Sequence, residues 1–201
     1  MQSLIDHARA FSTSAPQSTG ELSALELGQS PEVLFITCSD SRVVPTLFTG
    51  TRPGDLFELR TAGNIVPAYS TEHPSGEMAT VEYAVQVLGV RDIIVCGHSH
   101  CGAVGALVRD EDLTQLPAVQ GWLARGASAG LMGDDEGHAP DVAAPVQRHA
   151  LAQLDRLREY PCVAERLADG RLGLHAWYYE VHTGAVLAHR TDGDEAAFLP
   201  L

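Results

Sequence analysis

EVLFITC, residues 32–38, is a continuous apolar run that ends in a cysteine. A strand with one face in water alternates apolar and polar residues, so this uniform run predicts a strand buried on both faces, as in a parallel sheet covered by helices. DIIVCGH, residues 92–98, has the same character. DLFELR, residues 55–60, follows a Pro-Gly turn signal and is predicted to be a further strand. These segments predict a buried, parallel core.

Helical patterns alternate with these strands. Residues 76–90 and 144–160 carry apolar side chains at helical spacing, and residues 162–170 predict another short helix. Residues 172–190 predict a hairpin around a Thr-Gly turn. Parallel strands joined through helices require right-handed crossovers. The expected fold class is therefore α/β, with a mostly parallel central sheet flanked by helices and an antiparallel edge strand from the C-terminal hairpin.

The length and composition fit one domain, residues 1–201, with residues 1–27 as an N-terminal helical arm. Residues 116–124 predict a short helix, and residues 126–141 have the composition of a loop. A formal net charge of −13 argues against nucleic-acid and anionic-membrane partners, which select for basic residues. No stretch approaches the roughly 20 apolar residues of a membrane span, and the N-terminus lacks the pattern of a secretory signal. Four cysteines are too few for a disulfide framework, so we expect a cytoplasmic protein with free thiols or metal ligands.

Three candidate metal ligands follow the ends of two predicted strands. Cys38 ends the first strand, His98 ends another, and Cys101 comes three positions after His98. The carboxyl ends of neighbouring parallel strands meet at one edge of a sheet, where ligands bind. Two thiolates and one imidazole suit Zn²⁺, and three protein ligands leave the open position of a catalytic site. The sequence therefore predicts one zinc ion per chain, against the alternative that these three are ordinary core residues.

The remaining cysteines and histidines have no partner at ligand spacing. Cys96 lies inside a predicted strand and Cys162 on a predicted helix, so both are expected in the core. His100 is expected at the surface or just outside the ligand shell. Surface positions are also expected for His138, His149, His182 and His189, none of which has a ligand-spaced partner.

CSDSR, residues 38–42, is followed about sixty residues later by GHSHCG, residues 97–102. Together with PGDLFELRTAGN at 53–64 and VEYAV at 81–85, these segments resemble the β-class carbonic anhydrases, whose zinc motifs are C-x-D-x-R and H-x-x-C. The similarity extends from about residue 28 to residue 190. It implies an α/β fold, a zinc lyase that reversibly hydrates carbon dioxide to bicarbonate and a proton, and a homodimer or a dimer of dimers.

On this resemblance, Asp40 and Arg42 are the catalytic pair. Zinc lowers the pKa of its bound water, but two thiolates cancel most of the metal charge, so the site needs help in holding hydroxide. Arg42 can grip Asp40 with a two-pronged hydrogen bond and keep it ionised. An ionised carboxylate only accepts hydrogen bonds, so a zinc-bound hydroxide must donate to Asp40 and turn a lone pair toward the carbon. The alternative is a simple surface ion pair.

The resemblance also implies a substrate pocket. Gln29 matches a position whose amide hydrogen-bonds the substrate oxygen, and the backbone N–H of Gly102 suits an anionic product. Phe57, Ala62 and Tyr83 match positions that line an apolar cleft, part of it across a dimer interface, although from the sequence alone Phe57 and Tyr83 would be core.

Two departures from the family pattern matter. Thr61 stands where the family often has Asn. A bicarbonate-regulated subgroup has Trp and Gly where this chain has Phe35 and Thr37, so we expect Asp40 to stay paired with Arg42 rather than to bind zinc.

Two other functions compete. A carbon disulfide or carbonyl sulfide hydrolase would use the same metal site and differ in its access tunnel. A non-catalytic zinc-binding protein would normally supply four ligands in knuckle pairs, and this chain has no C-x-x-C segment.

Overall fold

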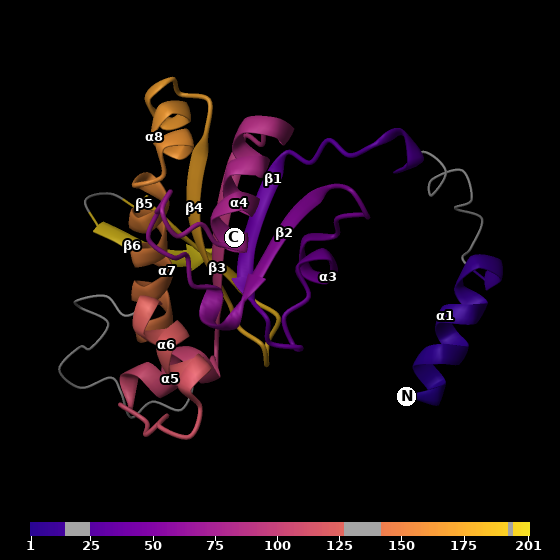
Figure 1. The fold of residues 1–201 in the computed structure, drawn as a ribbon, viewed down its shortest axis with the longest axis horizontal. Coiled ribbons are helices and arrows are strands. Elements are labelled where there is room, and N and C mark those ends of the chain that lie inside the picture. The colour runs from indigo at the N-terminus through magenta and orange to yellow at the C-terminus, as the bar shows by residue number, and fades with distance from the viewer. Residues whose placement is uncertain (15–24, 127–141, 193–194) are drawn as a thin grey trace. The chain divides into compact units, whose positions relative to one another are not determined.

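The computed structural model describes residues 1–14, 25–126, 142–192 and 195–201. The chain divides into two compact units, residues 1–30 and residues 31–201. The first contains helix α1 (Gln2–Ser14) and a 3₁₀ turn, η1 (Leu25–Leu27). The second contains a six-stranded sheet, its flanking helices and all of the predicted metal ligands (Figure 1).

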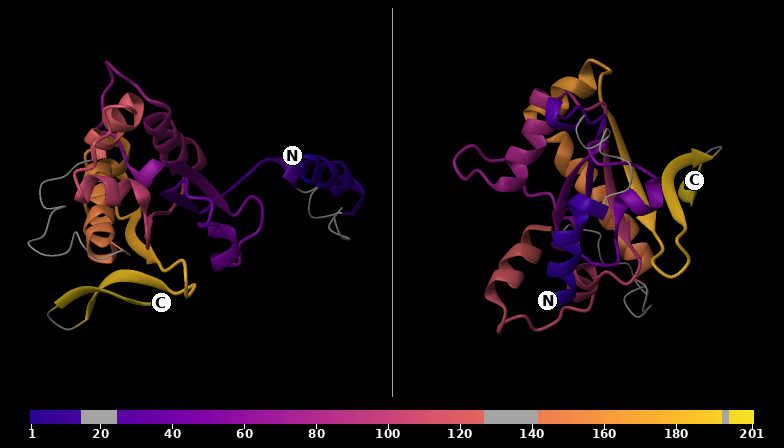
Figure 2. Two further views of the ribbon diagram at one scale, coloured as in Figure 1. Left: turned by 90° about the horizontal axis from the view of Figure 1, so that it is seen from below. Right: turned by 90° about the vertical axis from the view of Figure 1, so that its right-hand side faces the viewer.

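The sheet has the strand order β2-β1-β3-β4-β5-β6. Strands β1 (Val33–Cys38), β2 (Leu56–Thr61), β3 (Asp92–His98) and β4 (Gly173–Tyr179) are parallel to one another. Two antiparallel strands, β5 (Val186–Asp192) and β6 (Glu195–Pro200), complete the sheet. The predicted mixed α/β sheet is confirmed. The hairpin prediction missed β6, and Figure 2 shows the β5–β6 pair projecting away from the helices that cover the parallel strands.

The central strands are buried because both faces of the sheet are covered. Leu34 and Ile36 of β1 enter the main core with residues of α7 (Ala143–Arg158) and α8 (Pro161–Ala168). Phe35, which points to the other face, packs with Ile94 and Cys96 against side chains that include Phe48. Phe48 belongs to α3 (Pro45–Thr49), a five-residue helix too short to give a periodic signal in the sequence. This two-sided burial is the physical reason for the uniform apolar runs.

The remaining helices lie in the connections between the strands. The segment predicted as a helix at 76–90 is α4 (Gly76–Glu82) continued by a π-helical turn, η3 (Tyr83–Leu88), and Gly89 ends it in the left-handed conformation. A short 3₁₀ turn, η2 (Ala62–Asn64), follows β2. Helices α5 (Gly102–Val108) and α6 (Pro117–Gly126) come after β3. The loop predicted at 126–141 falls, apart from its first residue, outside the described residues.

Strand β3 and helix α7 pack closely at one glycine. A Cβ built on Gly97 would stand 2.4 Å from Cγ1 of Val146, so only glycine lets the helix lie this near to the strand. Gly97 directly precedes His98, and the close contact therefore fixes the end of the strand that carries this predicted ligand.

Among the residues that the structure describes, no helix is both long enough and apolar enough to cross a membrane.

Candidate metal centre

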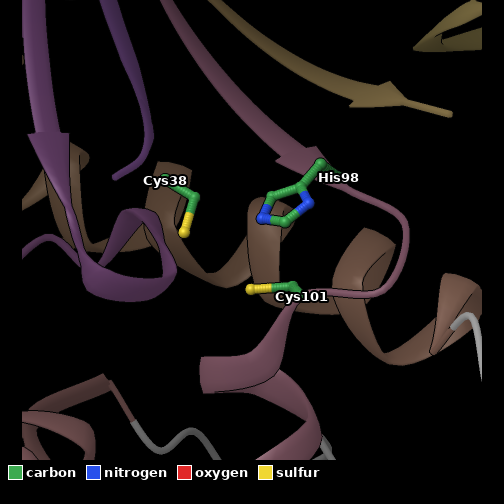
Figure 3. A group of neighbouring side chains, drawn as sticks. All are labelled: Cys38, His98 and Cys101. Atoms are coloured by element: carbon green, nitrogen blue, oxygen red, sulfur yellow. The ribbon is translucent and has the colours of Figure 1, made fainter. Parts of the chain in front are cut away.

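Cys38, His98 and Cys101 come together at the carboxyl edge of the sheet. Cys38 ends β1, His98 ends the neighbouring β3, and Cys101 immediately precedes α5. One ligand atom from each residue lies within 4.8 Å of the other two, and all three residues are buried. Figure 3 shows both sulfur atoms and the imidazole ring pointing toward a common space. The parallel pairing of β1 with β3 thus joins residues about sixty positions apart in the chain.

The hydrogen bonding of His98 leaves one ring nitrogen available as a ligand. Nδ1 lies 2.9 Å from the backbone carbonyl of Ser99. A carbonyl only accepts, so Nδ1 carries the proton and Nε2 presents its lone pair. Nε2 is buried and has no hydrogen-bond partner among the described residues. A buried polar atom normally finds a partner, and an orphaned imidazole nitrogen that faces two thiols is suited to bind a metal ion.

The thiols of Cys38 and Cys101 are linked by a hydrogen bond, so the pKa of each depends on the other. The pKa of Cys38 is lowered to about 4, mainly by a hydrogen bond from Cys101, although burial raises it. Further hydrogen bonds also lower this pKa, including one from the backbone N–H of Gly63 at 3.3 Å. The same contact with Cys38, together with burial, raises the pKa of Cys101. The contact between the two sulfur atoms therefore favours a state in which one thiol of the pair is ionised and the other donates a hydrogen bond to it. A bound cation would favour loss of the second proton, because thiolates are the metal-binding form.

Asp40 and Arg42 form the predicted two-pronged pair beside the ligands. Arg42 Nε donates to Oδ1 of Asp40 at 2.9 Å, and Nη2 donates to Oδ2 at 2.6 Å. The side-chain hydrogen bond from Arg42 is the main reason that the pKa of Asp40 lies well below its usual range. Oδ2 of Asp40 lies 3.9 Å from Nε2 of His98, so an ionised carboxylate borders the space between the three ligand atoms. Arg42 is further fixed by donating to the carbonyl of His100 at 3.1 Å.

Arg60 is a supporting residue that the sequence interpretation missed. It lies on β2, and its guanidinium donates to three backbone carbonyls at the end of β1 and just after it: those of Cys38 at 2.8 Å, Asp40 at 3.0 Å and Val43 at 2.7 Å. The predicted segment 55–60 contains Arg60 as a strand residue. Its partners could not be read from the sequence, because they depend on the pairing of two strands.

The predicted substrate residues are spread over several elements. Phe57 of β2 and Tyr83 of η3 are neighbours, with ring centroids 6.0 Å apart. Tyr83 is 45% exposed, so its side chain is not a core residue in this chain. Ala62 and Gly102 are exposed positions that start η2 and α5. Gln29 belongs to the unit of residues 1–30 and is exposed there, so its role stays a prediction.

The two positions that distinguish this chain from the regulated subgroup are both filled by packed side chains. The ring of Phe35 lies between those of Phe48 and Trp177, with centroids 6.0 and 5.9 Å away. Thr37 is buried and donates its hydroxyl to the carbonyl of Cys96 at 2.9 Å. Both side chains therefore have structural roles in the sheet.

The prediction that His149 lies at the surface is wrong. Its side chain is fully buried, and Nε2 lies 2.8 Å from the carbonyl of Gly63. The residue lies on the buried face of α7, three and four positions from Val146 and Gln153, so helical spacing was a usable signal.

The other predictions for cysteines and histidines can be checked in part. Cys96 and Cys162 are buried as expected, and burial raises the pKa of Cys96 to about 12. His100 and His182 are exposed, and His189 is half-buried. His138 lies outside the described residues.

Comparison with known proteins gives one consistent result. Residues 33–186 match a family model described as carbonic anhydrase. A carbonic anhydrase of Pseudomonas aeruginosa is 47% identical over 100% of this chain and 92% of its own length. Carbonic anhydrase 1 of Escherichia coli O157:H7 is 42% identical with the same coverage.

Solved structures agree with the sequence relatives. The β-carbonic anhydrase CcaA superposes with a TM-score of 0.86 at 40% identity, covering 100% of this chain and 99% of that chain. One structure from a study of two tetrameric β-carbonic anhydrases of Sordaria macrospora has a TM-score of 0.76 at 26% identity, covering 93% of this chain and 95% of that chain.

Proposed function

The chain belongs to the β-carbonic anhydrase family, and we propose that it interconverts carbon dioxide and bicarbonate with one zinc ion held by Cys38, His98 and Cys101. The observation that carries this proposal is the buried cluster of three ligand atoms with an orphaned imidazole nitrogen beside an ionised carboxylate.

The donor set fits zinc better than other common metals. Two sulfur ligands and one imidazole are soft or borderline donors, which disfavours magnesium and calcium. Three protein ligands are also the number that a catalytic zinc site uses, because a fourth position must stay open to water or substrate. The metal would supply Lewis acidity that lowers the pKa of a water molecule at that open position.

Asp40 would act as the acceptor that orients the nucleophile. Because Arg42 keeps its carboxylate ionised, Oδ2 can accept a hydrogen bond and cannot donate one. A water or hydroxide beside Oδ2 must therefore point its hydrogen at Asp40, which leaves an oxygen lone pair free for the carbon of carbon dioxide. The reaction adds this oxygen to the carbon, forming bicarbonate and releasing one proton per turnover.

The substrate pocket follows the family resemblance. We propose that the amide of Gln29 contacts the substrate oxygen and that the N–H of Gly102 contacts the anionic product. Phe57, Ala62 and Tyr83 would line an apolar approach, which suits a small nonpolar gas. The 6.0 Å spacing of the Phe57 and Tyr83 rings supports a common aromatic wall.

The active unit is proposed to be a homodimer, or a dimer of dimers. Tetrameric relatives have been described in Sordaria macrospora. The chain also exposes large apolar side chains that a second copy could cover, including Val44 at 41%, Leu47 at 78% and Val87 at 65%. A cytoplasmic location is proposed because all four cysteines are free, which suits a reducing compartment.

The two alternative functions are not favoured. The relatives and structures described above are all named carbonic anhydrases, so a carbonyl sulfide or carbon disulfide hydrolase has no particular observation behind it. A purely structural zinc site would have no use for the two-pronged Asp40–Arg42 pair at its open side.

Stopped-flow hydration of carbon dioxide by the zinc-loaded protein tests the proposal, with carbonyl sulfide turnover measured beside it. We expect about one zinc per chain and hydration that disappears when a chelator removes the metal. Cys101→Ser should lose both metal and activity, since a hydroxyl is a poor ligand compared with a thiolate. Cys162→Ser is the matched control, a buried cysteine on α8 outside the cluster, and should keep both. Full zinc occupancy in Cys101→Ser would remove Cys101 from the ligand set, and absent hydration by zinc-loaded wild type would refute the function.

A further inference from the structure

The η2 turn lies against the metal cluster and contacts it through one hydrogen bond. The backbone N–H of Gly63 donates to Sγ of Cys38 at 3.3 Å. Hydrogen bonds to a ligating sulfur set the electron density that the sulfur offers to a metal. The position of this N–H should therefore affect how tightly Cys38 binds the proposed zinc ion, although Gly63 itself supplies no ligand.

The turn can take this conformation only with glycine at its centre. Gly63 has a φ of +74°, in the left-handed region, and an added Cβ would stand 3.0 Å from Cβ of Ala103. Backbone conformation and close packing thus aim the N–H, but a turn of three residues does not hold itself rigid.

Trp122 of α6 holds the peptide group that carries this N–H. Its indole Nε1 donates to the carbonyl of Ala62 at 2.8 Å. The carbonyl of Ala62 and the N–H of Gly63 belong to the same peptide bond, so the indole, the peptide and the sulfur of Cys38 form one continuous chain of hydrogen bonds. A hydrogen bond accepted at one end of a peptide group polarises it and strengthens the donor at the other end.

His149 of α7 holds the next peptide group. Nε2 lies 2.8 Å from the carbonyl of Gly63, and because a carbonyl only accepts, Nε2 must carry the proton and donate. Burial lowers the pKa of His149, so the ring is neutral and keeps this arrangement at neutral pH. Gln153, one turn further along α7, accepts from the backbone N–H of Val66 at 2.9 Å. Helix α7 therefore forms hydrogen bonds with the backbone of the segment after β2 at two residues, Gly63 and Val66.

We propose that Trp122 and His149 are positioning residues of the metal centre, which clamp the two peptide groups on either side of Gly63 so that its N–H is directed at the Cys38 thiolate. The proposal rests on the zinc site proposed above. In the described part of the chain, neither side chain forms a hydrogen bond with a ligand atom. Each acts through the backbone of η2: Trp122 binds the carbonyl of Ala62 from α6, and His149 binds the carbonyl of Gly63 from α7.

The first test compares Trp122→Phe with Trp177→Phe. Phenylalanine keeps one aromatic ring and removes the indole donor together with the five-membered ring. Trp177→Phe is the control because it makes the same truncation at a residue that packs on Phe35 in a different part of the core. Zinc dissociation constants are measured by competition with a chromophoric chelator. Because partners of this kind typically change metal affinity 10- to 100-fold, we expect Trp122→Phe to weaken zinc binding about tenfold and Trp177→Phe to leave it at the wild-type value.

A spectroscopic readout separates positioning from a general loss of stability. In the Co²⁺-substituted protein, a weaker hydrogen bond to the thiolate raises the energy of the sulfur lone pair, so the sulfur-to-cobalt charge-transfer band should move to longer wavelength in Trp122→Phe. The metal-free proteins are melted in parallel. A variant that lowers only the melting temperature, with the cobalt band and zinc affinity unchanged, would show a merely structural tryptophan and overturn the proposal for Trp122.

His149 is tested by loss and rescue. His149→Phe removes the donor to Gly63, while in His149→Gln the amide nitrogen can occupy the place of Nε2. We expect the shifted cobalt band in the first variant and a band restored toward wild type in the second. If both histidine variants keep the wild-type band and zinc affinity, His149 has no positioning role. If wild type itself binds no stoichiometric zinc, the metal-site proposal fails together with this one.

Discussion

Gly97→Ala should destabilise the protein by crowding the contact between β3 and α7. The added methyl group would stand 2.4 Å from Cγ1 of Val146 and 3.4 Å from its carbonyl oxygen, and the first distance is closer than real Cβ atoms approach. Forcing an extra carbon into a packed core typically costs about 1–3 kcal/mol. Alanine in a strand regains about 0.5–1 kcal/mol because it loses less backbone entropy on folding than glycine does. A contact as short as 2.4 Å places the cost in the upper part of this range, about 2–3 kcal/mol, so we expect a net loss of about 1–2.5 kcal/mol in the free energy of unfolding.

Thermal unfolding measures this loss, at one protein concentration and one metal content because both shift the melting temperature. For a chain of this size, each kcal/mol corresponds to about 2–4 °C, so Gly97→Ala should melt about 2–10 °C below wild type. Gly121→Ala is the control, since a Cβ at Gly121 in α6 would meet nothing within 4 Å.

A double-mutant cycle identifies the contact responsible. Val146→Ala removes the methyl group that the new Cβ would meet, so the double variant should be more stable than the sum of the two single changes predicts, by about 0.5–3 kcal/mol. Strict additivity, or a Gly97→Ala protein that melts at or above wild type, would refute the argument that this glycine permits the close approach of α7.

Three further outcomes are expected. Arg42→Ala should lower the rate of carbon dioxide hydration at least about tenfold without changing the zinc content, because Asp40 loses the partner that keeps it in place. Unchanged hydration would mean that the pair is only structural. For the wild-type protein, a structure at neutral pH with an Asp40 oxygen about 2.0–2.2 Å from zinc would contradict the stable pairing. Light scattering of the active enzyme should give at least twice the 21.4 kDa of one chain, and an active monomer would count against the dimer. Burial lowers the pKa of His149 below 6.5, so below about pH 6.5 the unfolded state binds more protons than the folded state. The free energy of unfolding should therefore decrease as the pH is lowered through this range. In urea titrations His149→Gln should lose this part of the pH dependence, and an unchanged slope would show that another group causes it.

The parallel core and the metal ligands could be predicted because their signal is local. β3 has the predicted bounds, and β1 begins one residue after the predicted start, since a strand buried on both faces has no polar residues to blur its pattern. The ligands Cys38 and His98 are the final residues of these two strands, so finding the strands located the ligands.

What the sequence could not predict depends on contacts between distant segments. Arg60 reaches the carbonyl of Cys38 at the end of β1 only once β1 and β2 have paired, and Trp122 meets Ala62 across sixty residues of chain. Strand β6 was missed because its residues are mostly exposed and show no alternation of burial. The error at His149 has a different cause. The histidines were judged by ligand spacing alone, although His149 lies at helical spacing on the apolar face of its helix.

The parallel pairing of β1 with β3 also determines when during folding a metal can bind. A parallel pair cannot close through a tight turn, and here the chain must first build β2, α4 and η3 between the two strands. Contacts of such long sequence separation form slowly, since much loop entropy is lost before they are gained. Until then, Cys38 is remote from His98 and Cys101, and a short His-Cys pair alone is a poor chelate. Metal loading should therefore follow folding of the sheet, and the ion would act by slowing the reopening of a site that the chain has already assembled.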